Sequence, residues 1–186
     1  METLSAIEER RSIRGFFSCE LEKEKVMDIL NCGRLAPSAR NRQPWYFVVV
    51  QNDKKDIIAD MMIEYVNNSN YINEIENLGY KASVEMTANV MKQAPVLVLV
   101  FKPKDDIWVI EDNLSIGACV ENMCLRATDL EIGSLWIRDI AYVGEEVSKT
   151  FGHEDMELNC ALSLGYQSKF PKMRPRRELE EIVEWY

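Results

Sequence analysis

The 186 residues, of which 47% are hydrophobic and 28% charged, have the length and composition of one compact domain, and we predict a single domain over residues 1–186. A formal net charge of −9 argues against broad nucleic-acid binding, because that function depends on Lys and Arg side chains that neutralise phosphates. No apolar run approaches the roughly 20 residues that cross a bilayer, and the first residues lack a secretory signal, so we expect a cytoplasmic protein without membrane contacts.

The spacing of apolar residues predicts helices and strands that alternate along the chain. Pro37 and Pro95 each end a helical segment, because proline cannot continue a helix, and a run rich in β-branched and aromatic residues that predicts a buried strand follows each of them. In chain order we expect a short helix ending near residue 11, a helix over 20–35, a strand over 45–50, helices over 53–66 and 80–93, a strand over 96–101, an apolar helix over 112–130, a strand over 134–137, a short helix over 145–151 and a strand over 158–165.

Residues 67–79 are polar and rich in asparagine, which predicts a connection or a lid between two helices. Tyr65, Tyr71 and Tyr80, in and beside this segment, are candidates for stacking over a bound aromatic group. A surface loop without that role is the alternative. Substrate specificity, if the protein is an enzyme, is therefore expected to depend on this segment.

The last residues predict a tail that is helical or extended over 178–186. It ends in Trp185 and Tyr186, large aromatics that suit packing on a partner subunit or, equally simply, docking on their own chain. Together with the alternation of strands and helices, the pattern predicts an α/β or α+β layered domain with a small central sheet.

Cysteine and histidine usage restricts the chemistry. Five cysteines form no CxxC pair, which argues against zinc and iron–sulfur sites, so we expect no bound metal. His153 is the only histidine, which excludes a catalytic relay built on several histidines, and its polar turn predicts a surface position.

Basic residues gather near both ends of this acidic chain. Arg10, Arg11, Ser12 and Arg14 place three guanidinium groups and a hydroxyl within five residues, a set that can bind a phosphate through charge-assisted hydrogen bonds. The second cluster lies over 169–177. Charge alone favours the interpretation that both are solvated surface patches.

A proline-bracketed loop over 36–44 precedes the first predicted strand. It presents the hydroxyl of Ser38 and the carboxamides of Asn41 and Gln43. Carboxamides both donate and accept hydrogen bonds, as the imide edge of a heterocycle requires. An ordinary loop whose polar groups satisfy its own backbone is the equal alternative.

These segments together resemble the nitroreductase family. The motifs keep the family's order and spacing over nearly the whole chain. They are RRSIRGF at residues 10–16, APS at 36–38, NRQPW at 41–45, LEIGSLWI at 130–137, LGY at 164–166 and RPRRELEEIV at 174–183.

The resemblance implies an α+β fold with a central, mainly antiparallel sheet flanked by helices, in an intertwined homodimer that holds FMN non-covalently at the subunit interface. It implies NAD(P)H as co-substrate and a ping-pong hydride transfer to nitroaromatic, quinone or related acceptors, with the flavin rather than a side chain as the reactive centre. The implied site residues are Arg10, Ser12 and Arg176 at the flavin phosphate with Arg11 and Arg14 nearby, Ser38 and Asn41 from the loop, and the main chain of Trp136, Ile137 and Arg138 along the isoalloxazine.

Three alternatives remain open. The first is a specialised member of the family with one physiological substrate, for example a dehalogenase-like enzyme. The second is a flavin-binding or flavin-delivery protein without turnover. The third is a scaffold with two basic surface patches. A turnover profile separates the first from a broad reductase, reduction of bound FMN by NAD(P)H tests the second, and bound flavin with a dimeric mass excludes the third.

Overall fold

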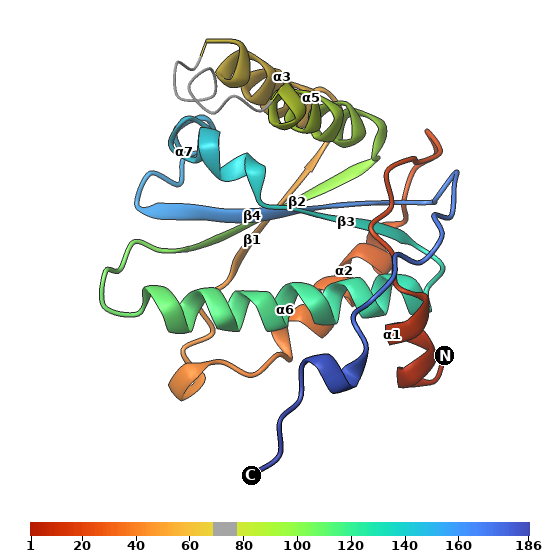
Figure 1. The fold of residues 1–186 in the computed structure, drawn as a ribbon. Helices are drawn as coiled ribbons and strands as arrows, with labels where there is room; N and C mark the ends of the chain where they lie inside the picture. The colour runs from red at the N-terminus through yellow and green to blue at the C-terminus, as the bar shows by residue number, and fades with distance from the viewer. Residues whose placement is uncertain (69–77) are drawn as a thin grey trace.

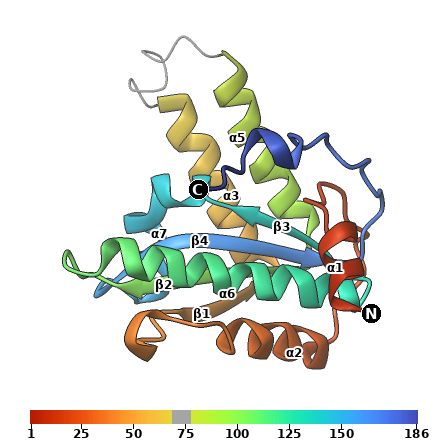
Figure 2. The ribbon, with the colours of Figure 1, turned by 60° about the horizontal axis from the view of Figure 1, so that its bottom comes forward.

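The computed structural model describes residues 1–68 and 78–186, which form three layers with a four-stranded sheet in the middle (Figure 1). The strands lie in the order β1 (Tyr46–Gln51), β2 (Val96–Pro103), β4 (Met156–Gly165), β3 (Gly133–Ile137), and every neighbouring pair is antiparallel. Helices α1 (Thr3–Glu9), α2 (Lys23–Arg34) and α6 (Val109–Asp129) cover one face, and α3 (Asp53–Asn68), α5 (Leu78–Gln93) and α7 (Gly144–Phe151) cover the other (Figures 1 and 2). The predicted fold class is confirmed.

Strand β2 contributes side chains to two hydrophobic cores, one on each face of the sheet. Leu97, Leu99 and Phe101 point into the core beneath α3 and α5, and the alternate residues, such as Val98 and Val100, point into the core beneath α2 and α6. All five side chains are completely buried. A strand covered on both faces needs apolar side chains at successive positions, which explains the uninterrupted run in the sequence.

The prediction that the first strand is buried is wrong. β1 is an end strand of the sheet, where Val50 is buried but Tyr46 is 47% and Val49 42% exposed. The expectation of a surface position for His153 also needs correction, since its ring is half-buried with its centroid 5.1 Å from that of Tyr46 and 5.3 Å from that of Phe101. The histidine therefore helps to cover one end of the sheet.

The two ends of the segment over 67–79, predicted as a connection or a lid, are helical. Helix α3 continues to Asn68 and α5 begins at Leu78; residues 69–77, with Tyr71, lie outside the described residues. The tail has one short 3₁₀ turn, η3 (Leu179–Glu181), and residues 168–186 are exposed throughout. Within residues 1–68 and 78–186, no helix is long and apolar enough to span a bilayer.

The cysteines differ sharply in burial, which predicts their reactivity. Burial raises the pKa of Cys119, Cys124 and Cys160 to about 12, whereas Cys19 is exposed. The thiolate is the reactive form, so a thiol reagent at mildly alkaline pH is expected to modify Cys19 rapidly and the three buried thiols only after unfolding. Counting the modified thiols in a colorimetric assay tests this. The half-buried Cys32 belongs to neither group, so a fast phase that survives in the double variant Cys19→Ser/Cys32→Ser contradicts the prediction.

Candidate functional site

The N-terminal segment crosses one end of the sheet and meets the start of the tail. Ser12 lies beside Ser134 of β3 as a parallel bridge, and the Ile13 N–H donates to the Ser134 carbonyl at 2.9 Å. The Phe17 N–H donates to the Tyr166 carbonyl at 2.8 Å, just beyond β4. Main-chain pairing thus fixes the arginine-rich segment next to the residues that lead into the second basic cluster.

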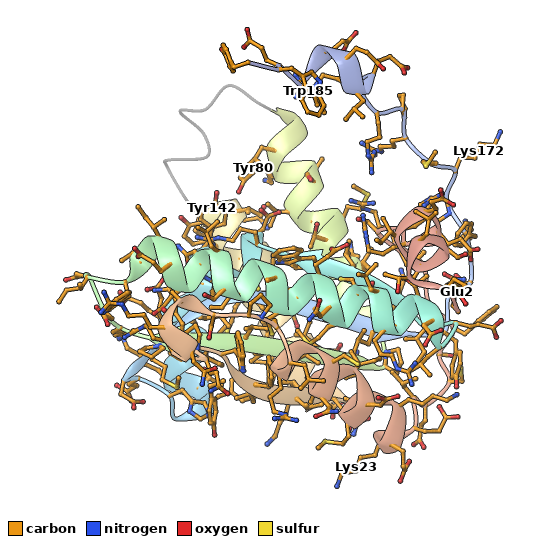
Figure 3. All side chains as sticks on the ribbon, turned by 90° about the horizontal axis from the view of Figure 1, so that it is seen from below. Glu2, Lys23, Tyr80, Tyr142, Lys172 and Trp185 are labelled. Atoms are coloured by element: carbon orange, nitrogen blue, oxygen red, sulfur yellow. The ribbon has the colours of Figure 1, made fainter. Side chains whose placement is uncertain are left out.

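A pocket of about 240 Å³ lies between this segment and the tail. It contains the arginines and the serine near the N-terminus that the family resemblance assigns to a phosphate, together with Arg176 from the tail. Figure 3 shows Lys172 on the tail, on the same side of the molecule as Glu2 at the start of α1. The residues lining the pocket are Arg10, Arg11, Ser12, Arg14, Pro171, Lys172, Met173, Arg174 and Arg176.

The first two arginines are held in place by neighbouring groups. The Arg10 Nε–H lies 3.1 Å from a carboxylate oxygen of Glu121 on α6. Arg11 donates to the main-chain carbonyls of Glu8 and Arg10, and its guanidinium lies 5.6 Å from the centroid of the Phe170 ring. Its Nε is buried and has no hydrogen-bond acceptor among the described residues, so one donor of this side chain is left unsatisfied there.

The positive charges of the other cations in the pocket are less well balanced by nearby carboxylates. Arg14 donates to the Ser12 carbonyl at 3.3 Å and Arg176 to the Arg174 carbonyl at 3.2 Å, both within their own segments. Among the ion pairs of the described residues, Glu121 with Arg10 is the one that involves a cation of this pocket. Cations that face one pocket without carboxylate partners form a site suited to an anion.

The loop that carries Ser38 and Asn41 has an unusual backbone. Arg40, Asn41 and Gln43 have φ angles of 50°, 57° and 49°, in the left-handed region that residues other than glycine rarely adopt. The Ser38 Oγ accepts a hydrogen bond from the Gln43 N–H at 3.0 Å, which closes the loop on itself. Strained backbone of this kind gathers at functional sites.

Within one chain, the structure does not bring this loop into the cationic pocket. The Ala39 N–H donates to the Ser115 Oγ in the first half of α6 at 3.3 Å, whereas Arg10 reaches Glu121 in the second half. The pocket lining includes neither Ser38 nor Asn41. Two of the three predicted groups of site residues therefore lie along different parts of α6.

The third group follows the end of β3. Trp136 is 42% exposed on the side of α6, where a Cβ built on Gly117 would lie 3.8 Å from its ring. Ile137 is buried and Arg138 is exposed. Trp136 and Ile137 still pair with β4, and after Arg138 the main chain leaves the sheet for the 3₁₀ turn η2 (Asp139–Val143).

Comparison with known proteins identifies the chain. The model of the nitroreductase family matches residues 7–166. The chain belongs to the nitroreductase family. An Archaeoglobus fulgidus protein named "Putative NADH dehydrogenase/NAD(P)H nitroreductase" is 31% identical over 170 residues, which are 89% of this chain and 85% of that protein. The resemblance inferred from the motifs is confirmed.

Solved structures agree with this assignment. A Desulfovibrio desulfuricans protein whose crystal structure is a complex with FMN is 25% identical, with a TM-score of 0.77 over 100% of this chain and 97% of that one. The FMN- and NADPH-dependent nitroreductase NfnB from Sphigopyxis sp. strain HMH has a TM-score of 0.85 at 17% identity, over 100% and 99% of the two chains. The second likeness concerns the fold alone.

Three features of this nitroreductase-family chain escaped the sequence interpretation. Tyr142 of η2 is one, since its ring stacks on Tyr65 at 5.6 Å and meets Tyr80 edge-on at 6.1 Å (Figure 3 labels Tyr80 and Tyr142). Burial is the main reason that the pKa of Tyr80 is raised. The others are Lys172 and Arg174 in the pocket, whose only signal was the basic composition of the second cluster, and the partners of Arg42, described below.

Proposed function

We propose that this protein is an FMN-dependent oxidoreductase that passes electrons from NAD(P)H to nitroaromatic, quinone or related acceptors by a ping-pong hydride transfer. Membership of the nitroreductase family and the FMN complex of a 25% identical relative support this cofactor. The observation in this chain that carries the proposal is the pocket shared by the two basic clusters.

The pocket suits the phosphate end of FMN. A phosphate monoester carries about two negative charges and three acceptor oxygens at neutral pH. Arg11 offers a buried Nε–H without an acceptor among the described residues, and Arg14 and Arg176 offer guanidinium groups without carboxylate partners there. When bound, the flavin supplies the hydride chemistry, and the role of the chain is to bind and orient it.

We further propose that the working unit is a homodimer in which a second copy completes each site. The separation of the Ser38 loop from the cationic pocket supports this, because one chain alone does not join them. Exposed apolar groups support it too: Ile110 and Leu114 on α6 are each 71% exposed, and Trp185 is 91% exposed on a tail that extends away from the three layers (Figures 1 and 3).

The cysteines support the proposal that the protein works in the cytoplasm. All five are free, as suits that reducing compartment.

An absorbance spectrum tests the cofactor and the donor. Purified protein is mixed with FMN, desalted and then titrated anaerobically with NADH and with NADPH. Retained flavin bands that bleach with either nucleotide are expected. Bands that resist both indicate a flavin carrier or a different donor, and a protein that retains no flavin contradicts the proposal.

A mixing experiment tests the shared site. Asn41→Ala and Arg176→Ala are each expected to bind FMN weakly as homodimers, because each damages both sites. If the two residues serve the same flavin from different subunits, random exchange of subunits restores about a quarter of the sites, since half of the dimers then hold one intact site. A mixture that binds no more FMN than its components contradicts the shared site, as does a monomeric mass by light scattering.

A further inference from the structure

The loop over residues 38–43 maintains an unfavourable backbone without glycine. Arg40, Asn41 and Gln43 are left-handed. Inside the loop, the Gln43 N–H donates to the Ser38 Oγ, and the N–H groups of Asn41 and Arg42 donate to the carbonyls of Ser38 and Ala39, each at 3.0 Å. Residues with side chains hold such angles only where surrounding contacts determine them. Contacts with residues outside the loop are therefore expected to hold its backbone in this conformation.

Arg42 supplies contacts of the required strength. Its Nε–H donates to one carboxylate oxygen of Asp112 at 3.1 Å, and its terminal NH2 donates to the other at 3.2 Å. The same NH2 donates to Asp105 at 3.0 Å. Asp112 lies in the first turn of α6 and is 1% exposed, so its carboxylate is buried against this guanidinium.

The segment that carries Asp105 is itself held by hydrogen bonds. Asp105 also accepts the N–H groups of Ile107 at 2.8 Å and Trp108 at 3.3 Å, which folds the segment before α6. The Trp108 ring lies 4.7 Å from the guanidinium of Arg42 and 5.2 Å from that of Arg40. A planar guanidinium that stacks on an indole and forks onto a carboxylate has one orientation, which an ammonium cannot reproduce.

These contacts lie on both sides of Asn41 in the chain. Arg40 and Arg42 pack on the segment before α6, and the Ala39 N–H donates to Ser115 one turn further along the helix. The carboxamide of Asn41 and the hydroxyl proton of Ser38 make none of these contacts, so they stay available to a ligand.

We propose that Arg42 is a positioning residue for the flavin: its contacts with Asp112, Asp105 and Trp108 hold the loop in the left-handed conformation that presents Ser38 and Asn41 to the cofactor. This inference rests on the proposed function. Arg42 does not touch the flavin itself; it acts through the shape of the loop.

Arg42→Lys tests the proposal, since it keeps the charge that Asp112 needs but loses the fork and the stacking. Asp112→Asn is the second variant. Arg126→Lys is the matched control, because Arg126 is a partly exposed arginine near the other end of α6 that pairs with Asp28 and Asp129. The readouts are FMN affinity by fluorescence quenching, the reduction potential of bound FMN, the melting temperature, and tryptic cleavage after Arg40 in the flavin-free protein.

For Arg42→Lys and Asp112→Asn we expect an FMN affinity lower by about tenfold or more, as misplaced polar contacts imply, a shifted potential, and faster cleavage after Arg40. The control loses melting temperature to a similar extent, with FMN affinity and cleavage rate unchanged. Variants that match the control in affinity, potential and cleavage overturn the proposal. A wild-type chain that binds no FMN overturns the proposed function and the flavin role with it, whereas the cleavage rates still decide whether Arg42 holds the loop.

Discussion

Arg176→Ala is expected to weaken FMN binding by about 2–3 kcal/mol, the scale of a charge-assisted hydrogen bond to a phosphate. Arg10→Ala is expected to have at least the same effect. Its loss removes one cation and also leaves the Glu121 carboxylate, now 3.1 Å from the Arg10 Nε, without a partner beside the bound anion. Titration of FMN fluorescence at constant ionic strength measures both affinities.

A control and a salt series make this test specific. Arg34→Ala removes a guanidinium that bonds Asn31 on its own helix α2, and its FMN affinity should equal that of the wild type. The wild-type affinity should fall with added salt, and the Arg176→Ala affinity should fall less steeply because fewer cations face the phosphate. Unchanged affinity in both Arg10→Ala and Arg176→Ala would remove the phosphate assignment.

Gly165→Ala is expected to destabilise the fold by about 2–3 kcal/mol, within the usual range for overpacking. A Cβ at this position, the last residue of β4, would lie 2.4 Å from the Pro95 Cδ and 3.1 Å from a ring carbon of Phe16. The proline ring is rigid and Phe16 is buried, so neither can move aside without disturbing the core. Urea unfolding followed by circular dichroism gives the free energy of unfolding.

Gly117→Ala is the matched control, because it adds the same methyl group with the opposite expected sign. Its Cβ would meet only the Trp136 ring at an ordinary 3.8 Å, and alanine is favoured over glycine inside a helix by roughly 0.5–1 kcal/mol. If both variants unfold at the same urea concentration as the wild type, the close approach at Gly165 has no energetic weight.

The sequence predicted the order and type of the elements because local patterns report them. The uninterrupted run at Leu97 to Phe101 and the periodicity of α6 each carry their own signal. The prediction that the first strand is buried was wrong, because the position of a strand in a sheet depends on which strands pair. β1 pairs only with β2 and lies at one edge of the sheet. Pairing order is a property of the whole chain and has no local signature.

The residues of the candidate site also divide into those that the sequence predicted and those that it did not. Each basic cluster is visible in the sequence, but only the family motifs joined Arg10 to Arg176. The role inferred for Arg42 had no local signal, because its carboxylate partner Asp112 lies 70 positions away. The left-handed residues of the loop were hidden for a different reason: glycine is the usual mark of such angles, and Arg40 and Asn41 carry side chains.

The pairing of the N-terminal segment with β3 and with the start of the tail has a consequence for biosynthesis. Ile13 has its partner at Ser134, and the pocket that Arg10 lines also needs Arg176 from almost the end of the chain. Contacts of such long sequence separation form late, because the intervening chain must first be ordered. A nascent chain on the ribosome therefore has no complete anion pocket, cofactor loading follows release, and a chain truncated before residue 174 is expected to accumulate in a flavin-free form.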